Sequence, residues 1–513
     1  MAADFVVRWA DFSGGNFGVL DPAYADKNQY SGQNVLRYNS GLLGPRAGLK
    51  QLAVNWGAYP GTHPVLGPYG FDVMDGNLLI NLGTRTHRIP VTAPTTSPYN
   101  VYAATPTGFV RYAQGNRVLY ALVNGDLYKH NEGTCAVTLI SLPGGIKLKA
   151  LTRWGYYLVG VQADLEYRLW HSTVSISGAD FDTWGPNNYL DVGSNLPIVT
   201  LKPLYNMLFA GKADGWWAIS GVLGEQATVR MRNMGNGPRD ERQATTTTDN
   251  QVLYWGADAT PMWFGGETPR IDADYQLAGY TTSFAADTVV ATPTGKRLVM
   301  IGERLGQSGA VIQSGMLLHD GGKWTTHTFD IPISAVAGND VRNASAMPAG
   351  VIFMCQRPKV INEAISIVSF QCDLDRPAYT TDTWAAPRDQ GSTELVTGQV
   401  DLPAHWDAQG RYLKVTSVTV QFRKWPSGIA GTRNELRCKV VPFGLYEGGQ
   451  QNTETKVWTQ SSDRADTGGT DDSMRFSFGE NPHSIGFQVQ FPVMRGVAIR
   501  EVIVEVEVRT TRG

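Results

Sequence analysis

The sequence predicts an all-β protein in which a β-propeller of about seven blades is followed by a β-sandwich module. Three observations lead to this prediction. Glycine (57 residues), proline (27) and aromatic residues (10%) are frequent among the 513 residues, whereas charged residues make up only 18%. Short apolar runs bounded by turn-forming residues recur along the first three quarters of the chain. Beyond about residue 388, longer strands alternate between apolar and polar residues.

The N-terminal residues come before any of these repeats. Phe5–Trp9 reads as a short strand, and the segment that follows it is polar and extended, with no core of its own. We expect residues 1–60 to form an extended N-terminal arm. We also expect Phe5–Trp9 to be a closing strand that completes the last propeller blade.

Seven apolar runs predict the propeller, which we place at residues 61–388. The runs are 78–81, 118–122, 157–161, 207–210, 252–255, 297–301 and 351–354, so successive runs begin 40, 39, 50, 45, 45 and 54 residues apart. Propeller blades repeat about every 40–50 residues. A blade is apolar on both faces and buries them by stacking in a ring. A large β-sandwich, or a pair of them, is the alternative fold.

Residues 389–513 are predicted to form the β-sandwich module. Residues 387–392 read as a linker, and alternating strands follow at 412–422, 486–491 and 499–509. In the last of these strands, valines at 502, 504, 506 and 508 alternate with mostly acidic residues. A sheet with one buried face and one solvated face produces this pattern.

Charge and cysteine content narrow the function. The formal net charge is −2, whereas a protein that binds nucleic acid by itself normally carries a basic excess. The four cysteines form no CxxC pair and do not indicate a disulfide scaffold. Residues 1–8 lack the features of a signal peptide, and no apolar run reaches the ~20 residues of a membrane span. We therefore expect synthesis in a cytoplasm and no membrane-spanning segment.

The sequence contains none of the common catalytic patterns. The eight histidines are scattered without metal-ligand spacing, and neither a GxSxG elbow nor a Walker-type loop occurs. Asp320–Trp324 is similar to part of the Asp-box of sialidase-type propellers, but its spacing differs by one residue and it occurs once. We therefore expect no catalytic residues, no metal and no cofactor.

Three features leave alternatives open. Carboxylates at positions 164, 166, 272, 274, 373 and 375 could supply the pair that a glycosidase needs, although we interpret them as solvated turn residues. The acidic loop 463–472 could bind calcium, although an exposed hairpin loop is the preferred interpretation. The aromatic runs 216–217, 254–255 and 262–264 are interpreted as packing between blades rather than as a surface for sugars or proteins.

The first fifty residues contain the most specific pattern in the chain. Gly14-Gly15 is followed by an extended polar segment, by Asn39, and by residues 41–49, which read GLLGPRAGL. This arrangement resembles the N-termini of bacteriophage tail β-propeller proteins. These include the tail nozzle, tail-tubular and packaged-DNA-stabilising proteins of short-tailed phages and related minor tail proteins of long-tailed phages. The residues of the expected assembly arm are Trp9, Phe12, Gly14, Gly15, Asn39, Pro45, Arg46 and Gly48.

The resemblance implies a structural virion protein and not an enzyme. Such a protein would be a nozzle or a distal or peripheral tail component, acting in tail assembly and in DNA retention or delivery. Its partners would be other tail proteins, further copies in a homo-oligomeric ring, viral DNA without specific contact, and the host surface. The alternative is a propeller that binds or degrades host surface polysaccharide. An open central pocket with two convergent carboxylates and an aromatic platform would favour this alternative.

Overall fold

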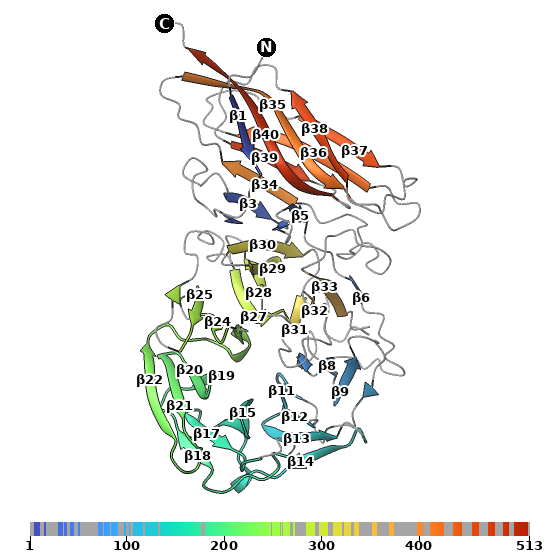
Figure 1. Cartoon of the computed structure of the whole chain (residues 1–513). Coiled ribbons are helices and arrows are strands. Elements are labelled where there is room, and N and C mark those ends of the chain that lie inside the picture. Colours follow the sequence, from blue (N-terminus) through green and yellow to red (C-terminus); the bar gives the residue numbers. More distant parts are fainter. Residues whose placement is uncertain are drawn as a thin grey trace.

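The computed structural model shows an all-β chain with a ring of blades at one end and a second module at the other (Figure 1). It describes residues 106–266 except for 116–117, 132–133, 176–179, 248, 257 and 259. Elsewhere it describes the strands named below and residues 10, 42, 76, 84, 102 and 292. Two short 3-10 helices, η1 (Pro143–Gly145) and η2 (Glu241–Gln243), are the helices of this described part.

Seven antiparallel blades of four strands form a β-propeller, which confirms the predicted fold. Their strands are β7 (Gly70–Met74), β8 (Asn77–Leu82), β9 (Arg85–Pro90) and β10 (Ser97–Pro98) in blade 1; β11 (Arg111–Gln114), β12 (Val118–Val123), β13 (Asp126–Asn131) and β14 (Val137–Ile140) in blade 2; β15 (Leu148–Trp154), β16 (Tyr157–Gln162), β17 (Arg168–His171) and β18 (Tyr189–Asp191) in blade 3; β19 (Ile198–Leu204), β20 (Met207–Lys212), β21 (Gly215–Ser220) and β22 (Thr228–Met234) in blade 4; β23 (Ala244–Thr246), β24 (Val252–Trp255), β25 (Pro261–Phe264) and β26 (Arg270–Ile271) in blade 5; β27 (Phe284–Ala291), β28 (Arg297–Leu305), β29 (Val311–Asp320) and β30 (Lys323–Phe329) in blade 6; β31 (Ile333–Ala337), β32 (Val351–Gln356), β33 (Ser369–Asp373) and β6 (Lys50–Gln51) in blade 7.

The seven apolar runs of the sequence are the second strands of the seven blades. A second strand has a hydrogen-bonded neighbour on each side and a packed blade against each face. Its side chains are therefore buried on both faces, and all six residues of β16 are buried. This environment explains why the second strands read as continuous apolar runs, whereas the outer strands do not.

The ring is closed both at its inner strands and at the outer strand of blade 7. The first strand of each blade contacts the first strand of the next, and β31 of blade 7 contacts β7 of blade 1. At the outside of blade 7, β6 pairs antiparallel with β33, with Gln51 opposite Phe370. An N-terminal segment therefore supplies the last strand of the last blade.

The prediction that Phe5–Trp9 is this closing strand was wrong. These residues form β1, which pairs antiparallel with β40 (Val497–Thr510) in the C-terminal module, with Trp9 opposite Val502. Trp9 is 1% exposed. Trp9 lies in the sheet around β40, which has one buried face. Burial of its large apolar side chain on that face favours the pairing of β1 with β40.

Aromatic packing joins neighbouring blades, as the sequence indicated for its Trp- and Tyr-rich runs. The ring of Trp216 in blade 4 stacks on that of Phe264 in blade 5, with ring centres 4.7 Å apart. Trp255 and Trp263 of blade 5 continue into the cluster around Met300 and Trp324 of blade 6. These side chains are buried between blades and not displayed on a surface.

The strands of the predicted β-sandwich, residues 389–513, lie in two sheets, and N-terminal strands are added to both. One sheet has the strand order β38 (Thr470–Ser477), β35 (Arg411–Lys424), β40, β5 (Leu43–Pro45) and β4 (Val35–Arg37), with β1 also paired to β40. The other contains β3 (Gln29–Gln33), β34 (Gly398–Pro403), β39 (Gly486–Phe491), β36 (Asn434–Phe443) and β37 (Glu454–Gln460), with β2 (Gly15–Asn16) paired to β3. Val502 and Val504 are buried whereas Glu501 and Glu505 are partly exposed, as the alternation predicted.

Strand β3 connects the module to the propeller. On one side it pairs antiparallel with β34, and on the other side Gln33 pairs in parallel with Thr326 of β30, the outer strand of blade 6. Blade 6 and half of the sandwich therefore form one continuous sheet of ten strands. Strands β3 and β5 lie beside this junction in Figure 1.

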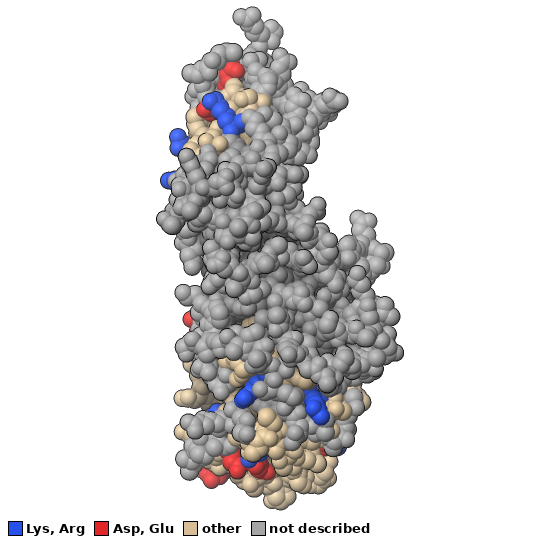
Figure 2. All heavy atoms as spheres, turned by 90° about the vertical axis from the view of Figure 1, so that its right-hand side faces the viewer, with Lys and Arg blue, Asp and Glu red and all other residues tan. Residues whose placement is uncertain are grey.

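Charged side chains of both signs occur among the described residues at both ends of the molecule. Figure 2 shows Lys and Arg side chains and Asp and Glu side chains of the described residues on the propeller end and on the module end of one face. This distribution agrees with the formal net charge of −2.

Blades 1 and 2 share a buried polar network. The hydroxyl oxygen of Thr86 lies 2.6 Å from that of Tyr102 and 3.0 Å from that of Tyr112. The Tyr102 hydroxyl lies 2.9 Å from Nε2 of His130. Burial lowers the pKa of His130 to about 3, and burial together with Arg85 lowers the pKa of the neighbouring His87 to about 4.

Deleting the closing strand should destabilise the propeller. We compare a chain that lacks residues 1–45 with one that lacks residues 1–51, because both lose β1 to β5 and only the second loses β6. The second chain should unfold about 2 °C lower, which corresponds to about 2 kcal/mol in a protein of this size. Differential scanning calorimetry measures the difference, and equal unfolding temperatures would contradict the closing role of β6.

The protein should lose stability in acid below about pH 6.5. His87 and His130 remain neutral in the folded state, whereas the same side chains take up protons in the unfolded state. Their contribution is complete above about pH 6.5 and is lost as the pH falls towards about 4 for His87 and about 3 for His130. The variant His130→Gln keeps a polar group near Tyr102 and should flatten the fall of the unfolding temperature between these pH values. An unchanged slope would refute this assignment.

Candidate functional site

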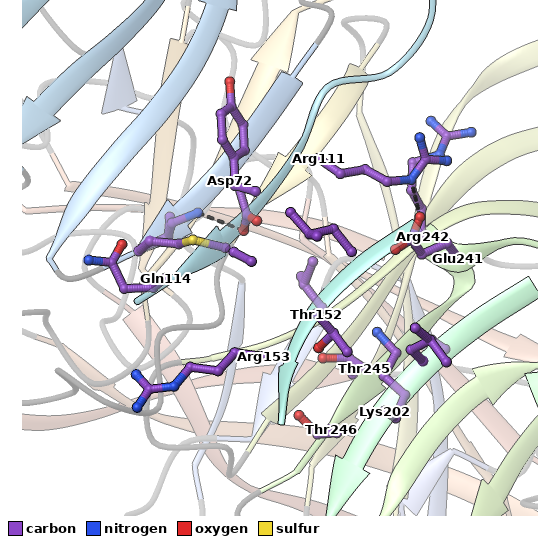
Figure 3. A pocket seen from close by; sticks show the side chains of 18 of the residues that line it. Asp72, Arg111, Gln114, Thr152, Arg153, Lys202, Glu241, Arg242, Thr245 and Thr246 are labelled. Carbon is purple, nitrogen blue, oxygen red and sulfur yellow. Dashed lines mark hydrogen bonds and ion pairs between the residues drawn. The ribbon is translucent and has the colours of Figure 1, made fainter. Parts of the chain in front are cut away.

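The first strands of blades 1 to 6 line a cavity of about 670 Å³ in the central channel of the propeller. Three of its polar residues occupy equivalent positions, two residues before the end of a first strand: Asp72 in β7, Thr152 in β15 and Lys202 in β19. Equivalent positions of the blades converge on the axis of the ring. Residues far apart in the sequence therefore face one another across the cavity (Figure 3).

An ion pair crosses the channel from blade 2 to the segment between blades 4 and 5. Arg111 begins β11, and its Nε donates to the carboxylate of Glu241 at the start of η2. This helix is capped by Asp240, whose carboxylate accepts from the Arg242 amide at 2.9 Å. Burial raises the pKa of Glu241, while Arg111 and then Lys202 oppose the shift.

The ion pair between Arg111 and Glu241 lies between two cavities. A second cavity, of about 490 Å³, shares Phe109, Arg111 and Glu241 with the first. Its other lining residues include Leu148, Lys149, Ala150 and Val199 at the beginnings of first strands. They also include Glu166, which forms an ion pair with Lys149 at 2.8 Å. The guanidinium of Arg242 lies 5.3 Å from the centre of the Phe109 ring and reinforces the same crossing. The pair therefore separates the channel interior from the face where the first strands begin.

Lys202 is the cation of the channel interior that lacks a direct partner. Its ammonium group makes no hydrogen bond or ion pair with the part of the chain that the structure describes, and it lines the larger cavity. Burial lowers the pKa of Lys202, and the more distant carboxylates of Glu241 and Asp72 oppose this shift. A cation in this situation is available to an anion that enters the cavity.

Two exposed tyrosines lie at the end of the channel where the first strands finish. Tyr156 is 58% exposed and Tyr205 is 62% exposed, and they occupy the two-residue turns after β15 and β19. Arg153, Gly155 and Pro203, which lie one to three residues before these tyrosines, line the cavity. The tyrosines therefore flank this end of the cavity on neighbouring blades.

The backbone at Tyr205 is unusual for a tyrosine. Its φ is 53°, a left-handed value that favours glycine, and the equivalent turn position in blade 3 is Gly155 with φ 56°. A non-glycine residue with this conformation costs about 1–2 kcal/mol. The fold supplies no compensation through burial, because the Tyr205 side chain is mostly exposed. Strained residues of this kind concentrate at functional sites.

The predicted assembly-arm residues do not form a separate projecting arm where the structure describes them. Trp9 is buried against β40, Gly15 lies in β2 opposite Gln29, and Pro45 lies in β5 opposite Val35. Phe12, Gly14, Asn39, Arg46 and Gly48 lie outside the described residues.

The candidate carboxylates that the structure describes are Asp164, Glu166 and Asp373, and none of their described contacts joins two of them as a pair across a cleft. Asp164 accepts from Gln162 at 2.7 Å, and Glu166 pairs with Lys149. Asp373 ends β33, and positions 272, 274 and 375 lie outside the described residues. Asp320 pairs with Lys323 in the hairpin between β29 and β30, so the Asp-box-like segment is a turn.

The described residues form neither a metal-binding cluster nor a membrane-spanning helix. Within the described residues, no group of three His, Cys, Asp or Glu side chains could hold a metal. Residues 463–469 of the acidic loop are not described. No helix in the described part of the chain is long and apolar enough to span a bilayer.

Sequence reasoning missed the residues that the channel brings together. Arg111, Lys202 and Glu241 belong to no motif, because the ring and not a local spacing makes them neighbours. Tyr205 carried a weak signal, since a tyrosine stands where a tight turn between two strands favours glycine or asparagine.

No family model matches the sequence, and no curated protein matches it. The chain is similar to solved structures that include the β-propeller domain of Cps50 (Swd1) from Myceliophteria thermophila, with 8% identity over 64% of this chain and 99% of that one and a TM-score of 0.42. YCF48 bound to a D1 peptide matches with 9% identity over 64% and 99% of the two chains (TM-score 0.39). YjhT matches with 10% identity over 52% and 98% (TM-score 0.35). These similarities concern the propeller fold.

The ion pair across the channel should stabilise the propeller more than a surface pair does. The side chains of Arg111 and Glu241 are 28% and 19% exposed, whereas those of the control pair Lys147 and Asp126 are 52% and 34% exposed. Glu241→Gln should lower the free energy of unfolding by about 2 kcal/mol. Urea denaturation of double-mutant cycles should give a coupling above about 1 kcal/mol for the channel pair and less for the control pair. Equal couplings would contradict this assignment.

Proposed function

We propose that this chain is a structural component of a bacteriophage tail. It would act as a nozzle or as a distal or peripheral tail protein, in tail assembly and in DNA retention or delivery. One observation carries the proposal: the N-terminal segment whose sequence resembles phage tail propeller proteins is the segment that joins the propeller to the sandwich. Strand β3 lies between β30 and β34, and the following segment closes blade 7 through β6.

Continuous hydrogen bonding suits a component of a mechanical assembly. Among the described strands, β3 pairs with blade 6 on one side and with the sandwich strand β34 on the other. A force applied to the sandwich is therefore transmitted to the propeller through main-chain hydrogen bonds. In the proposed role, copies of the chain form a ring and contact other tail proteins. The near-neutral charge is compatible with a wall that surrounds DNA without holding it.

The alternative of a glycan-degrading propeller receives less support. Retaining and inverting glycosidases need two carboxyl groups that are free to act on either side of the sugar. The carboxylates that line the larger cavity are Asp72 and Glu241, and Glu241 is paired with Arg111. Synthesis in a bacterial host cytoplasm and incorporation into the virion belong to the same proposal as the tail role.

Localisation in an intact particle tests the proposal. An antibody raised against residues 389–513 should label the tail of purified phage particles in immunogold electron microscopy. Light scattering coupled to size-exclusion chromatography should show that the purified full chain forms a ring-sized oligomer. A chain that stays monomeric and is absent from purified particles would overturn the proposal.

A further inference from the structure

We propose that the end of the channel flanked by Tyr156 and Tyr205 binds a saccharide that carries a carboxylate group. We call this region the channel-end site and define it by Tyr156, Tyr205, Arg153, Thr152 and Lys202. The inference adds a ligand to the proposed structural role and does not depend on that role.

The two tyrosines provide the surface on which a sugar ring can pack. Their side chains are more than half exposed, and they lie in equivalent turns of neighbouring blades beside the cavity. An aromatic ring with a hydroxyl group offers an apolar face for the C–H groups of a sugar and a polar group at its edge. Two such rings on adjacent blades suit a ligand of at least two sugar units.

The conformation of Tyr205 indicates that its aromatic side chain serves a role other than folding. Blade 3 makes the equivalent turn with Gly155, which adopts the left-handed backbone without strain. Blade 4 makes the turn with a strained tyrosine whose ring is 62% exposed. Neither packing nor backbone geometry requires this side chain, so a ligand contact is the simplest role for it.

The cavity beside the tyrosines supplies polar and cationic groups. Figure 3 shows Lys202, Thr245 and Thr246 near one another, Arg153 apart from them with its guanidinium directed away, and the Arg111–Glu241 pair at another side of the cavity. Nε of Arg153 donates to the Gly155 carbonyl at 3.2 Å, and its guanidinium lies 5.7 Å from the centre of the Phe181 ring, so Lys202 is the cation offered to a ligand. Hydroxyl groups and amide donors suit sugar hydroxyls, and the volume of about 670 Å³ is in the range of ligand sites.

The charge balance explains why the saccharide should be acidic. Lys202 has no direct partner in the described structure, and its burial disfavours the charged ammonium. Of the two carboxylates near it, Glu241 is engaged by Arg111, and Asp72 accepts from the Val73 amide at 2.8 Å. A ligand carboxylate would pair with Lys202 and offset the cost of burying it. A neutral sugar would bring no charge to pair with Lys202.

Titration calorimetry with defined probes tests the channel-end site. The probes are trigalacturonate, the neutral trisaccharide maltotriose, acetate and inorganic phosphate, each titrated into the full chain. Trigalacturonate should bind more tightly than the other three. Tyr205→Gly and Tyr156→Ser should each weaken it about fivefold, and Lys202→Met should weaken it at least about tenfold. Leu139→Ser, at a 54% exposed position of blade 2, is the matched control and should change nothing.

The variant Tyr205→Gly separates binding from folding. Glycine fits the φ of 53°, so the unfolding temperature should stay the same or rise while affinity falls. The proposal is overturned if trigalacturonate does not bind, or if acetate or phosphate binds equally well. It is also overturned if Leu139→Ser weakens binding as much as Tyr205→Gly. A change of oligomeric state in Tyr205→Gly with unchanged saccharide affinity would assign the tyrosines to a protein interface instead. Each result is independent of whether antibodies label phage tails.

Discussion

The pairing of exposed strand edges by the N-terminal segment is the interaction on which the rest of the structure depends. A blade of a propeller ends in an outer strand whose N–H and C=O groups are open on one side. In blade 7 that position is occupied by β6, and in blade 6 the outer strand β30 is covered by β3. The same segment then contributes β1, β4 and β5 to the sheet around β40. Some fifty N-terminal residues thus complete blade 7, cover the outer edge of blade 6 and add strands to both sheets of the sandwich.

This arrangement has a kinetic consequence. Strand β6 can pair only after β33 is in place. Strand β1 can pair only after β40, at the other end of the chain, is in place. Contacts between residues so far apart in sequence are entropically costly to form and slow folding. Blades 2 to 5 are each built from consecutive strands and can form locally. We therefore infer that the central blades form early and that the N-terminal segment joins late.

The channel illustrates how a repeat fold creates a site. Equivalent positions of different blades point at one axis, so Asp72, Thr152 and Lys202 meet although nothing in their local sequence relates them. The ion pair between Arg111 and Glu241 holds opposite sides of the ring together and divides the hollow space. Beside it, the strained turn at Tyr205 keeps an aromatic ring exposed at the end of the cavity.

Sequence patterns identified the parts of this protein whose environment is repeated and apolar. The seven second strands were recognisable because burial on both faces demands continuous apolar residues, and β40 was recognisable because one buried face demands alternation. The tertiary structure alone decided that Lys50–Gln51 closes the ring and that Phe5–Trp9 joins the sandwich. Both are short strands stabilised by main-chain pairing with distant partners, and main-chain pairing leaves little trace in side-chain identity. It likewise decided which charges meet in the channel, because convergence on the ring axis is a property of the closed ring and not of any segment.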